Sequence, residues 1–454
     1  MKSFNIGIFG FNNNFIKFLE HVKNKKTKYN LKFVDKEKNL NKIDFNKIIK
    51  KILSNKINII ALCDKTLIPL LSQNIDFFIN KKIKIVQASE NFDVENHGFI
   101  IEKPFRDYSF EELFLRKTLK LNLSNDFGVI KNKKILITGG AGSIGSGLVK
   151  KLIKFDLKKL YVIDNNEYNI FKLKDSLDSN LSKKIEFKLV NIENEELLNQ
   201  NFKDIKPNVV FHAAALKHVI FLENNIQQGI LTNVIGTKNV LEASNKNKVQ
   251  NFIHISTDKA AEPKSVLGFT KLLSEYLCHN FKSKKMKIGV VRFGNVFNSY
   301  GSAAESFKNQ ILNSKKIRLS HPKVERYFMS NLEATNLILT SLKFISEKNN
   351  QLNSRTFICD MGDPIKIKDL VTKMLYLSGR SPKKNILGTY YGLNNIEKIS
   401  EKLISKNEKI LKILDKRIFE INRIYRKVDL KKLNTLVYNN QNNKKLKIQL
   451  KNLI

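Results

Sequence analysis

The sequence is poor in cysteine, and nothing in it would bring the cysteines together. Cys63, Cys278 and Cys359 are the only three in 454 residues, and no CxxC or Cys/His spacing surrounds them. A zinc site or a disulfide framework depends on such spacing. Neither is indicated, so we expect no metal site and a reducing, cytoplasmic compartment.

Long hydrophobic runs are also missing. No apolar stretch approaches the roughly 18 residues that a membrane-spanning helix requires. The first residues, MKSFNIGIFGFNNNF, lack the apolar core and the small-residue cleavage site of a signal peptide. We therefore expect a soluble protein without a membrane span.

Acidic residues are scarce, because 42 Asp and Glu residues face 81 Lys and Arg residues, which gives a formal net charge of +39. Clustered cations attract nucleic acid or anionic membranes, since binding releases counterions. Here the excess is nearly all lysine and is spread along a chain rich in Asn, Ile and Phe, as an AT-rich coding sequence would produce. We expect no nucleic-acid partner, although a polyanion-binding module remains an alternative that rests on charge alone.

Short apolar runs alternate with helix-like segments along most of the chain, which is the pattern of parallel α/β sheets. Residues 1–105 predict a Rossmann-like N-terminal domain. Gly7 and Gly10 would begin a phosphate loop there, but Asn13 occupies the place of a third glycine. The glycine loop is therefore degenerate, and a structural role is favoured for this domain.

The remainder of the chain divides into three regions. Residues 106–130 predict a linker, and residues 131–400 predict a larger domain whose substrate lobe is mainly 295–400. Residues 401–454 predict a lysine-rich helical tail, because apolar residues recur at three-and-four spacing in EKILKILDKRIFEINRIY. The expected fold class is α/β: a Rossmann-type doubly wound parallel sheet with a smaller C-terminal substrate lobe, preceded by a second Rossmann-like α/β domain.

The stretch KKILITGGAGSIGSGLVKKLI carries the strongest single signal. A predicted strand at 134–138 leads into Gly139, Gly142 and Gly145 and then into a helix, as in a dinucleotide-binding fingerprint. In that fingerprint the glycines let the backbone approach a pyrophosphate, whose charge lies at the helix N-terminus. The motif predicts a nicotinamide dinucleotide site.

The following strands add further contacts to this cofactor. Asp164 ends the next strand about twenty residues on, where a carboxylate accepts the ribose hydroxyls and repels a 2′-phosphate. NAD is favoured over NADP, since Asn165 and Asn166 bring no arginine. Small alanines after the fourth strand are expected to line the cofactor. Tight helix–sheet packing is the alternative explanation for them. The residues expected to bind the cofactor are Gly139, Gly142, Ser143, Ile144, Gly145, Asp164, Asn191, Ala213, Ala214 and Lys217.

Seven blocks then occur in one order: TGGAGSIGS, FHAAALKHV, TNVIGTKNV, ISTDKA, VRFGNVFNSYGS, ERYFMSNLEA and DMGDPIKIKDL. Together they resemble the bacterial polysaccharide-biosynthesis UDP-N-acetylglucosamine 4,6-dehydratases, of the extended short-chain dehydrogenase/reductase superfamily. The resemblance implies NAD-dependent 4,6-dehydration of a UDP-N-acetylhexosamine, with UDP-N-acetylglucosamine as the expected substrate. The product would be a 4-keto-6-deoxy sugar nucleotide for surface polysaccharide or glycan biosynthesis. It also implies a homo-oligomer, either a dimer or a hexamer.

The same resemblance implies catalytic roles for residues that follow the fifth strand, at the carboxyl end of a parallel sheet where ligands bind. Thr257 would donate to the C4 oxygen, Asp258 would be the acid for the departing hydroxyl, and Lys259 would be the base at C5. Lys271 would hold the nicotinamide ribose.

The second half of the chain would supply the substrate contacts. Arg292 and Asn295 are expected to face the sugar-nucleotide cleft, and Arg326 is expected to clamp the pyrophosphate with a bidentate fork. A structural salt bridge is the alternative for Arg292.

Three places depart from the family pattern. Leu267 stands where short-chain dehydrogenases normally carry the tyrosine of Tyr-x-x-x-Lys, and Leu272 replaces a basic residue. Residues 392–398 read GLNNIEK where relatives show GLRPGEK, so Asn394 replaces an arginine expected near UDP. Leu267 and the altered residues 392–398 favour, as one alternative, a catalytically inactive NAD-binding or scaffolding protein. Within the enzyme class, a C5-inverting dehydratase or another sugar-nucleotide epimerase is the alternative.

Overall fold

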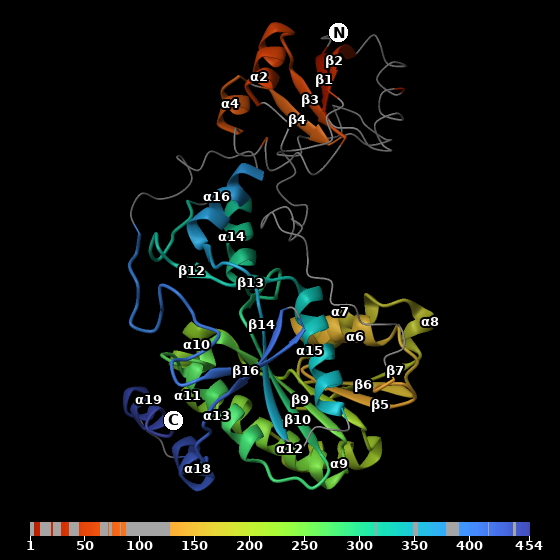
Figure 1. Ribbon diagram of the computed structural model, residues 1–454, viewed down its shortest axis with the longest axis vertical. Coiled ribbons are helices and arrows are strands. Elements are labelled where there is room, and N and C mark those ends of the chain that lie inside the picture. Colours follow the sequence, from red (N-terminus) through yellow and green to blue (C-terminus); the bar gives the residue numbers. More distant parts are fainter. Residues whose placement is uncertain are drawn as a thin grey trace. The chain divides into compact units, whose positions relative to one another are not determined.

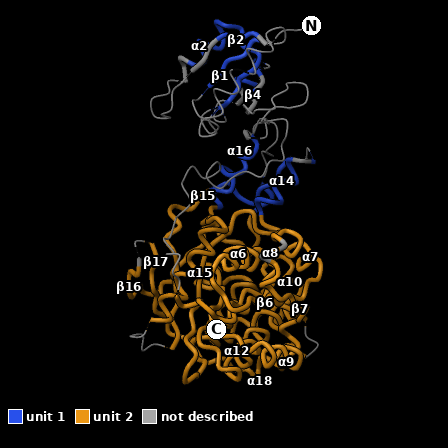
Figure 2. The backbone as a smooth tube through the Cα atoms, turned by 90° about the vertical axis from the view of Figure 1, so that its right-hand side faces the viewer, with its two compact units in different colours: residues 1–117, 303–324, 366–392 blue, residues 118–302, 325–365, 393–454 orange. Residues whose placement is uncertain are grey.

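The computed structural model describes most of the chain outside its N-terminal region. The described residues are 4–9, 20, 29–35, 45–63, 71, 75–81, 83–87, 128–313, 316–347, 353–377, 390–415, 417–438 and 442–454. They belong to two compact units, coloured separately in Figure 2. Unit 1 comprises residues 1–117, 303–324 and 366–392, and unit 2 comprises residues 118–302, 325–365 and 393–454.

The N-terminal part of unit 1 contains a four-stranded sheet with the spatial order β2-β1-β3-β4, in which all neighbours are parallel. Its elements are β1 (Phe4–Phe9), β2 (Tyr29–Asp35), α2 (Phe45–Ser54), β3 (Ile59–Leu62), α4 (Ile75–Asn80) and β4 (Lys84–Gln87). The parallel α/β architecture expected for this region is confirmed. The degenerate glycine loop at Gly10 and Asn13, and the linker up to residue 127, lie outside the described residues.

Unit 2 is built on a nine-stranded sheet (Figure 1). In spatial order its strands are β16 (Lys409–Asp415), β17 (Ile418–Asn422), β14 (Ser354–Cys359), β10 (Lys287–Phe293), β9 (Asn251–Thr257), β8 (Val209–His212), β5 (Lys134–Thr138), β6 (Lys159–Asp164) and β7 (Ile185–Leu189). Neighbours from β14 to β7 are parallel, whereas β17 and β16 are antiparallel additions. The predicted Rossmann-type parallel sheet is therefore confirmed.

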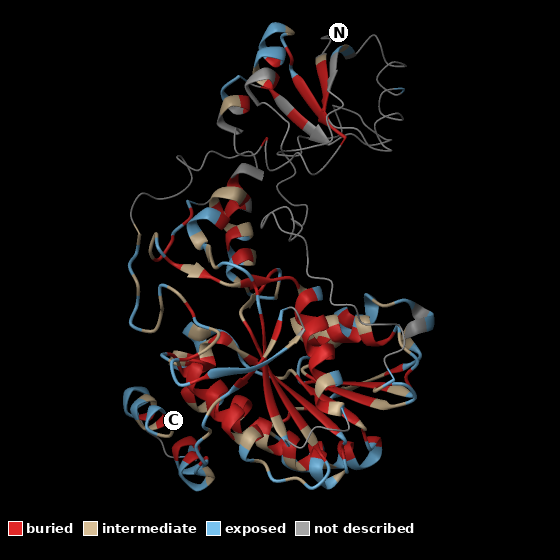
Figure 3. Ribbon diagram, viewed as in Figure 1, coloured by how far each residue is buried: buried red, intermediate tan, exposed pale blue. Residues whose placement is uncertain are grey.

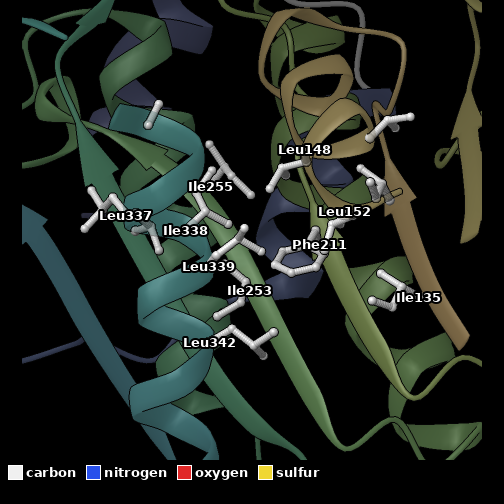
Figure 4. Packing of buried hydrophobic residues seen from close by; sticks show 14 of the residues in the cluster. Ile135, Leu148, Leu152, Phe211, Ile253, Ile255, Leu337, Ile338, Leu339 and Leu342 are labelled. Atoms are coloured by element: carbon white, nitrogen blue, oxygen red, sulfur yellow. The ribbon is translucent and has the colours of Figure 1, made fainter. Parts of the chain in front are cut away.

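Helices cover both faces of this sheet. Successive strand residues point to opposite sides, so each strand contributes to a cluster on either face. On β5, Ile135 and Ile137 pack against one cluster and Leu136 against the other. The first cluster includes α6 (Ser143–Leu152) and α15 (Asn331–Ser346), as Figure 4 shows. The second includes α9 (Glu195–Ile205) and α12 (Gly236–Lys246), and the central strands are accordingly buried on both sides (Figure 3).

The remaining described elements complete the two units. In unit 2 they are α7 (Glu167–Asp175), α8 (Ser179–Ser182), α10 (Val219–Asn224), α11 (Ile226–Ile230), a π-helical turn (Leu231–Ile235), a 3-10 turn (Asp258–Ala260), α13 (Val266–Asn280), β11 (Asn295–Val296), β12 (Glu325–Arg326) and β13 (Phe328–Met329). Unit 1 also contains α14 (Ala303–Leu312) and α16 (Ile367–Leu377). In β15 (Ile365–Lys366), the first residue is assigned to unit 2 and the second to unit 1.

The prediction of a helix across residues 408–425 is wrong. This segment forms β16 and β17, an antiparallel hairpin that extends the main sheet beside β14. Ile418 and Ile421 of β17 are buried, and burying them on a sheet outweighed the helical spacing of the sequence. Helices begin later, at α18 (Leu430–Tyr438) and α19 (Asn443–Lys451).

The C-terminal helices pack on the body of unit 2. Leu433 and Leu436 of α18 and Leu446 and Leu450 of α19 join a buried cluster with α10, α11 and α13. None of the helices in the described ranges combines the length and apolarity that crossing a bilayer requires.

Candidate active site

The strand order of the main sheet reverses between β5 and β8, which lie side by side although β6 and β7 separate them in the sequence. In doubly wound sheets the loops that leave the carboxyl ends of two such strands diverge and open a crevice for a ligand. Here those loops begin at Gly139 and Ala213. The fold therefore places the predicted fingerprint at the reversal point.

The glycines are needed for the close packing of this loop. Gly139 has a φ of +64°, and a Cβ on it would lie 2.5 Å from the backbone of Ala214. A Cβ on Gly145 would lie 2.2 Å from the Gly139 carbonyl oxygen. Gly142 is the N-cap of α6 and offers no side chain to the first N–H groups of that helix, which leaves them to bind an anion. Ser143 accepts a hydrogen bond on Oγ from the Tyr300 backbone at 2.8 Å.

Asp164 ends β6 beside this loop. Its Oδ2 accepts a hydrogen bond from the Ala141 N–H at 3.0 Å, and its Oδ1 accepts one from the Asn166 N–H at 3.1 Å. These bonds fix the carboxylate at the end of the strand, and each oxygen keeps a lone pair for a ligand hydroxyl. Asn166 itself caps α7 by accepting from Asn169 N–H. The arrangement fits the ribose-binding role predicted for Asp164.

The other residues expected to contact the cofactor lie on loops at the same edge of the sheet. Asn191 follows β7 and is partly buried, with its Oδ1 bonded to the Glu193 N–H. Ala213 and Ala214 follow β8 and are also partly buried, whereas Lys217 is exposed.

Thr257, Asp258 and Lys259 form a bonded group where β9 ends in the 3-10 turn. The Thr257 hydroxyl donates to Asp258 Oδ1 at 2.9 Å, and Lys259 Nζ donates to the same oxygen at 3.0 Å. Thr257 Oγ1 also caps the turn by accepting from the Lys259 N–H. The three side chains predicted to handle protons therefore meet at one carboxylate oxygen.

The second oxygen of Asp258 is different. The residue is completely buried, and Oδ2 has no hydrogen-bond partner among the described residues. A buried carboxylate oxygen without a partner is costly unless a ligand group meets it. A ligand hydroxyl at this oxygen would suit the acid role predicted for Asp258.

Lys271 lies deeper than the sequence suggested. It is 5% exposed, and Nζ donates to the Ile255 carbonyl at 2.6 Å and lies 3.3 Å from His254 Nε2. Burial lowers the pKa of Lys271 to about 8, although Glu275 and Cys278 act in the opposite direction. Its role at the nicotinamide ribose stays a prediction.

Leu267 is 5% exposed, on the first turn of α13. It packs in the apolar cluster of α10, α11 and α13 that the C-terminal helices cover. This position thus contributes apolar packing where other short-chain dehydrogenases carry a phenol.

The expected role of Arg292 needs correction. The side chain is fully buried, and each of its three nitrogens binds a carboxylate of the fold. Its Nε and Nη2 bind Glu275 at 2.7 and 2.5 Å, and its Nη1 binds Glu408 at 2.9 Å. These carboxylates hold the pKa of Arg292 well above its usual range against the effect of burial. The structural salt bridge kept as an alternative is what the structure contains.

Arg326 and Asn295 are the two remaining residues predicted to bind substrate. Arg326 Nη1 donates to the Glu325 and Ile399 carbonyls at 2.7 and 3.0 Å, and Nη2 lies 3.6 Å from a Glu397 carboxylate oxygen. Asn295 is partly buried at the start of β11. The contact with a phosphate remains a prediction for both residues.

Sequence reasoning missed the residues that surround the catalytic group from the C-terminal segment. Glu401 lies 3.9 Å from Lys259 Nζ, and Arg423 Nη1 donates to the Ala260 and Ala261 carbonyls. Tyr327 was missed as well, and burial and carboxylates that include Asp258 raise the pKa of its phenol. Nothing in the local sequence distinguished Glu401 from the other charged residues around it, because its burial and its contact with Lys259 appear only in the folded chain.

The mostly parallel sheet, with the glycine turn at its reversal point, defines a Rossmann-type α/β fold of the extended short-chain dehydrogenase/reductase superfamily. The chain belongs to the Polysaccharide biosynthesis protein family, which matches residues 135–423.

Two curated relatives illustrate this membership. The capsular polysaccharide biosynthesis protein CapD of Staphylococcus aureus is 34% identical over 372 residues, or 80% of this chain and 60% of that protein. The probable polysaccharide biosynthesis protein EpsC of Bacillus subtilis is 35% identical over 326 residues, or 71% and 53%. The chain thus spans only a little over half the length of these relatives.

Solved structures agree on the fold. The X-ray structure of Pen from Bacillus thuringiensis is 30% identical, with a TM-score of 0.57, and covers 65% of this chain and 87% of that one. The dTDP-glucose 4,6-dehydratase DesIV from Streptomyces venezuelae, solved with NAD and TYD bound, has a TM-score of 0.52 at 18% identity and covers 60% and 88%.

The burial of Arg292 predicts a loss of stability when its charge is removed. Arg292→Met leaves Glu275 and Glu408 buried without a cation, so we expect the free energy of unfolding to fall by about 3–5 kcal/mol. Arg426→Met, at an exposed arginine of the same unit, is the control and should change it by less than about 0.5 kcal/mol. Urea unfolding followed by circular dichroism measures both. Equal stability of the two variants, together with weaker UDP binding by Arg292→Met, would show instead that Arg292 binds the substrate.

The lowered pKa of Lys271 predicts a pH-dependent stability difference. Its pKa falls from 10.5 to about 8 in the folded chain, so below pH 8 the buried ammonium destabilises the fold. That cost is on the order of 3 kcal/mol and disappears as pH rises from 8 to 10.5, because the unfolded chain then releases its proton too. Compared with Lys271→Met, the natural protein should gain relative stability over that pH range in denaturant titrations. A difference that does not vary with pH would contradict the assignment.

Proposed function

We propose that the chain catalyses the NAD-dependent 4,6-dehydration of a UDP-N-acetylhexosamine, with UDP-N-acetylglucosamine as the first candidate. The observation that carries this proposal is the group of Thr257, Asp258 and Lys259 at the end of β9. Two strands away on the same edge of the sheet lies the glycine loop after β5. An acid, a base and a hydroxyl donor are therefore grouped beside a site suited to a dinucleotide.

The residues at the reversal point fit NAD. The open N-terminus of α6 suits a pyrophosphate, and the Asp164 carboxylate suits the adenosine ribose hydroxyls while repelling a 2′-phosphate. Bound NAD would accept a hydride from C4 of the sugar and return it to C6. Lys271, Asn191 and Lys217 complete the proposed cofactor contacts.

The chain's own residues move the protons. As C4 is oxidised, the Asp258 carboxylate takes the O4 proton. Lys259 then removes the C5 proton from the 4-keto sugar, while Asp258 passes its proton to the C6 hydroxyl, which leaves as water. Lys259 then returns its proton to C5 as hydride reaches C6. For this, Thr257 must turn its hydroxyl from Asp258 Oδ1 to the C4 oxygen of the substrate. General acid and base groups of this kind contribute about 10²–10⁴-fold to a rate.

The names of similar proteins support a sugar nucleotide as substrate. DesIV is described as a dTDP-glucose 4,6-dehydratase. The UDP-glucose 4-epimerase of Rickettsia bellii is 34% identical over 223 residues, or 47% of this chain. A nucleoside-diphosphate hexose is common to both names. Arg326 would bind its diphosphate, and the abundant lysines would attract it.

The near alternatives are a sugar-nucleotide epimerase and a dehydratase that inverts C5. Both would use the same cofactor site, but only the dehydratases need an acid for a departing hydroxyl. Asp258 Oδ2, which has no hydrogen-bond partner within the described part of the chain, favours dehydration for that reason. An inactive scaffold is favoured by Leu267 and by the altered residues 392–398, and the assay below separates it from the enzyme. A dimeric or hexameric assembly and a cytoplasmic location belong to the same proposal.

The test incubates the purified full chain with NAD and UDP-N-acetylglucosamine. We expect a product lighter by one water in mass spectrometry, and ring couplings in proton NMR that show the configuration at C5. Lys259→Ala should lower the rate by at least about 100-fold, because it removes the C5 base, whereas Lys284→Ala, at an exposed lysine after α13, should not change it. A wild-type chain that leaves the sugar nucleotide unchanged, or epimerises it without losing water, would refute the proposed reaction.

A further inference from the structure

Glu401 is a buried carboxylate in a segment without regular secondary structure. It is 6% exposed, and its Oε1 lies 3.9 Å from Lys259 Nζ. Its Oε2 lies 3.4 Å from Lys398 Nζ, without the geometry of a hydrogen bond. Burying a carboxylate is expensive unless cations compensate for the lost water. The two lysines supply that compensation, and one of them is the proposed C5 base.

The segment that carries Glu401 is bonded, before and after Glu401, to residues 260–262 at the end of the 3-10 turn. On the N-terminal side, Lys398 Nζ donates to the Glu262 carbonyl. On the C-terminal side, Glu408 binds Arg423 at 3.0 Å, and Arg423 donates to the Ala260 and Ala261 carbonyls at 3.2 and 3.3 Å. The backbone on either side of Glu401 therefore cannot move away from the turn without breaking these bonds.

Glu408 is itself held in place. Its Oε2 accepts from the Ser405 N–H at 2.7 Å and from the buried Arg292 at 2.9 Å. Arg292 in turn binds Glu275, which accepts from the Ser256 hydroxyl on β9. A continuous set of hydrogen bonds and ion pairs thus connects β9, which precedes the proposed catalytic residues, to the segment that carries Glu401.

The Lys259 amine therefore lies near two carboxylates. Its Nζ donates to Asp258 Oδ1 at 3.0 Å and forms a longer ion pair with Glu401 Oε1 at 3.9 Å. The proposed reaction consumes the proton of Asp258 and loads a proton on Lys259. While Asp258 still holds its proton, it offers Lys259 no charge. Glu401 exchanges no proton in the proposed reaction.

We propose that Glu401 is a positioning residue that holds the Lys259 amine in line with C5 while Asp258 exchanges its proton. The inference rests on the proposed function, in which Lys259 is the C5 base. The proton balance of that reaction is unchanged, because Glu401 neither gives nor takes a proton. It keeps a second anion beside the amine during the interval in which Asp258 is neutral.

The first test measures the contact without relying on catalysis. The full chain is acetylated with limiting acetic anhydride, and the rate at Lys259 is read by peptide mass spectrometry against the other lysines as internal standards. In Glu401→Gln the amine loses one carboxylate partner, so we expect Lys259 to react several-fold faster while the standards do not change. Glu262→Gln is the control, because its carboxylate pairs with the half-exposed Lys402. An unchanged Lys259 rate in Glu401→Gln would overturn the proposal.

The second test measures the proposed role. The rate at which C5 of the sugar takes up deuterium from heavy water should fall about tenfold in Glu401→Gln, with the dissociation constant for UDP unchanged. Glu401→Asp retains the charge and should restore part of the rate. Parallel loss of exchange, UDP binding and stability would mean that Glu401 only maintains the fold. If the wild-type chain exchanges and dehydrates nothing, the proposed function fails, and the acetylation result still decides whether Glu401 controls the Lys259 amine.

Discussion

The full burial of Arg292 is the constraint on which the rest of the site depends. A guanidinium with no access to water must be matched by carboxylates inside the fold, and here Glu275 and Glu408 provide them. Glu275 comes from α13 and Glu408 from the segment before β16, so this requirement joins the helix, the central strand β10 and the C-terminal hairpin. The 3-10 turn after β9, which carries the proposed catalytic residues, is bonded to this charge cluster through Arg423.

This arrangement keeps the proposed proton-transfer group ordered in a chain with leucine at position 267. In the short-chain dehydrogenase pattern a phenol and a lysine share one helix. Here the lysine is buried against the Ile255 carbonyl, and the first turn of α13 is committed to apolar packing. The proton donors and acceptors are instead gathered on the adjacent turn, where Thr257, Asp258 and Lys259 bond to one another.

Much of the fold and part of the site could be read from the sequence. The glycine spacing, Asp164 and the Thr-Asp-Lys cluster are local patterns at strand ends, and the structure places each of them at the edge where parallel strands present ligands. Arg292 was misread because its partners are 17 and 116 residues away, and only the folded chain shows that they enclose it. The hairpin of β16 and β17 was misread because KILKILD satisfies a helical period as well as a strand, and only the neighbouring β14 decides between them.

The central claim is that Asp258 and Lys259 carry the acid and base roles without a phenol. The most direct measurement is a crystal structure of the chain with NAD and the UDP-sugar bound. The account predicts the C6 hydroxyl within hydrogen-bond distance of Asp258 Oδ2, about 3 Å, and Lys259 Nζ facing C5. A hexose whose C5 and C6 lie beyond the reach of both side chains, or against the Tyr327 phenol instead, would contradict it.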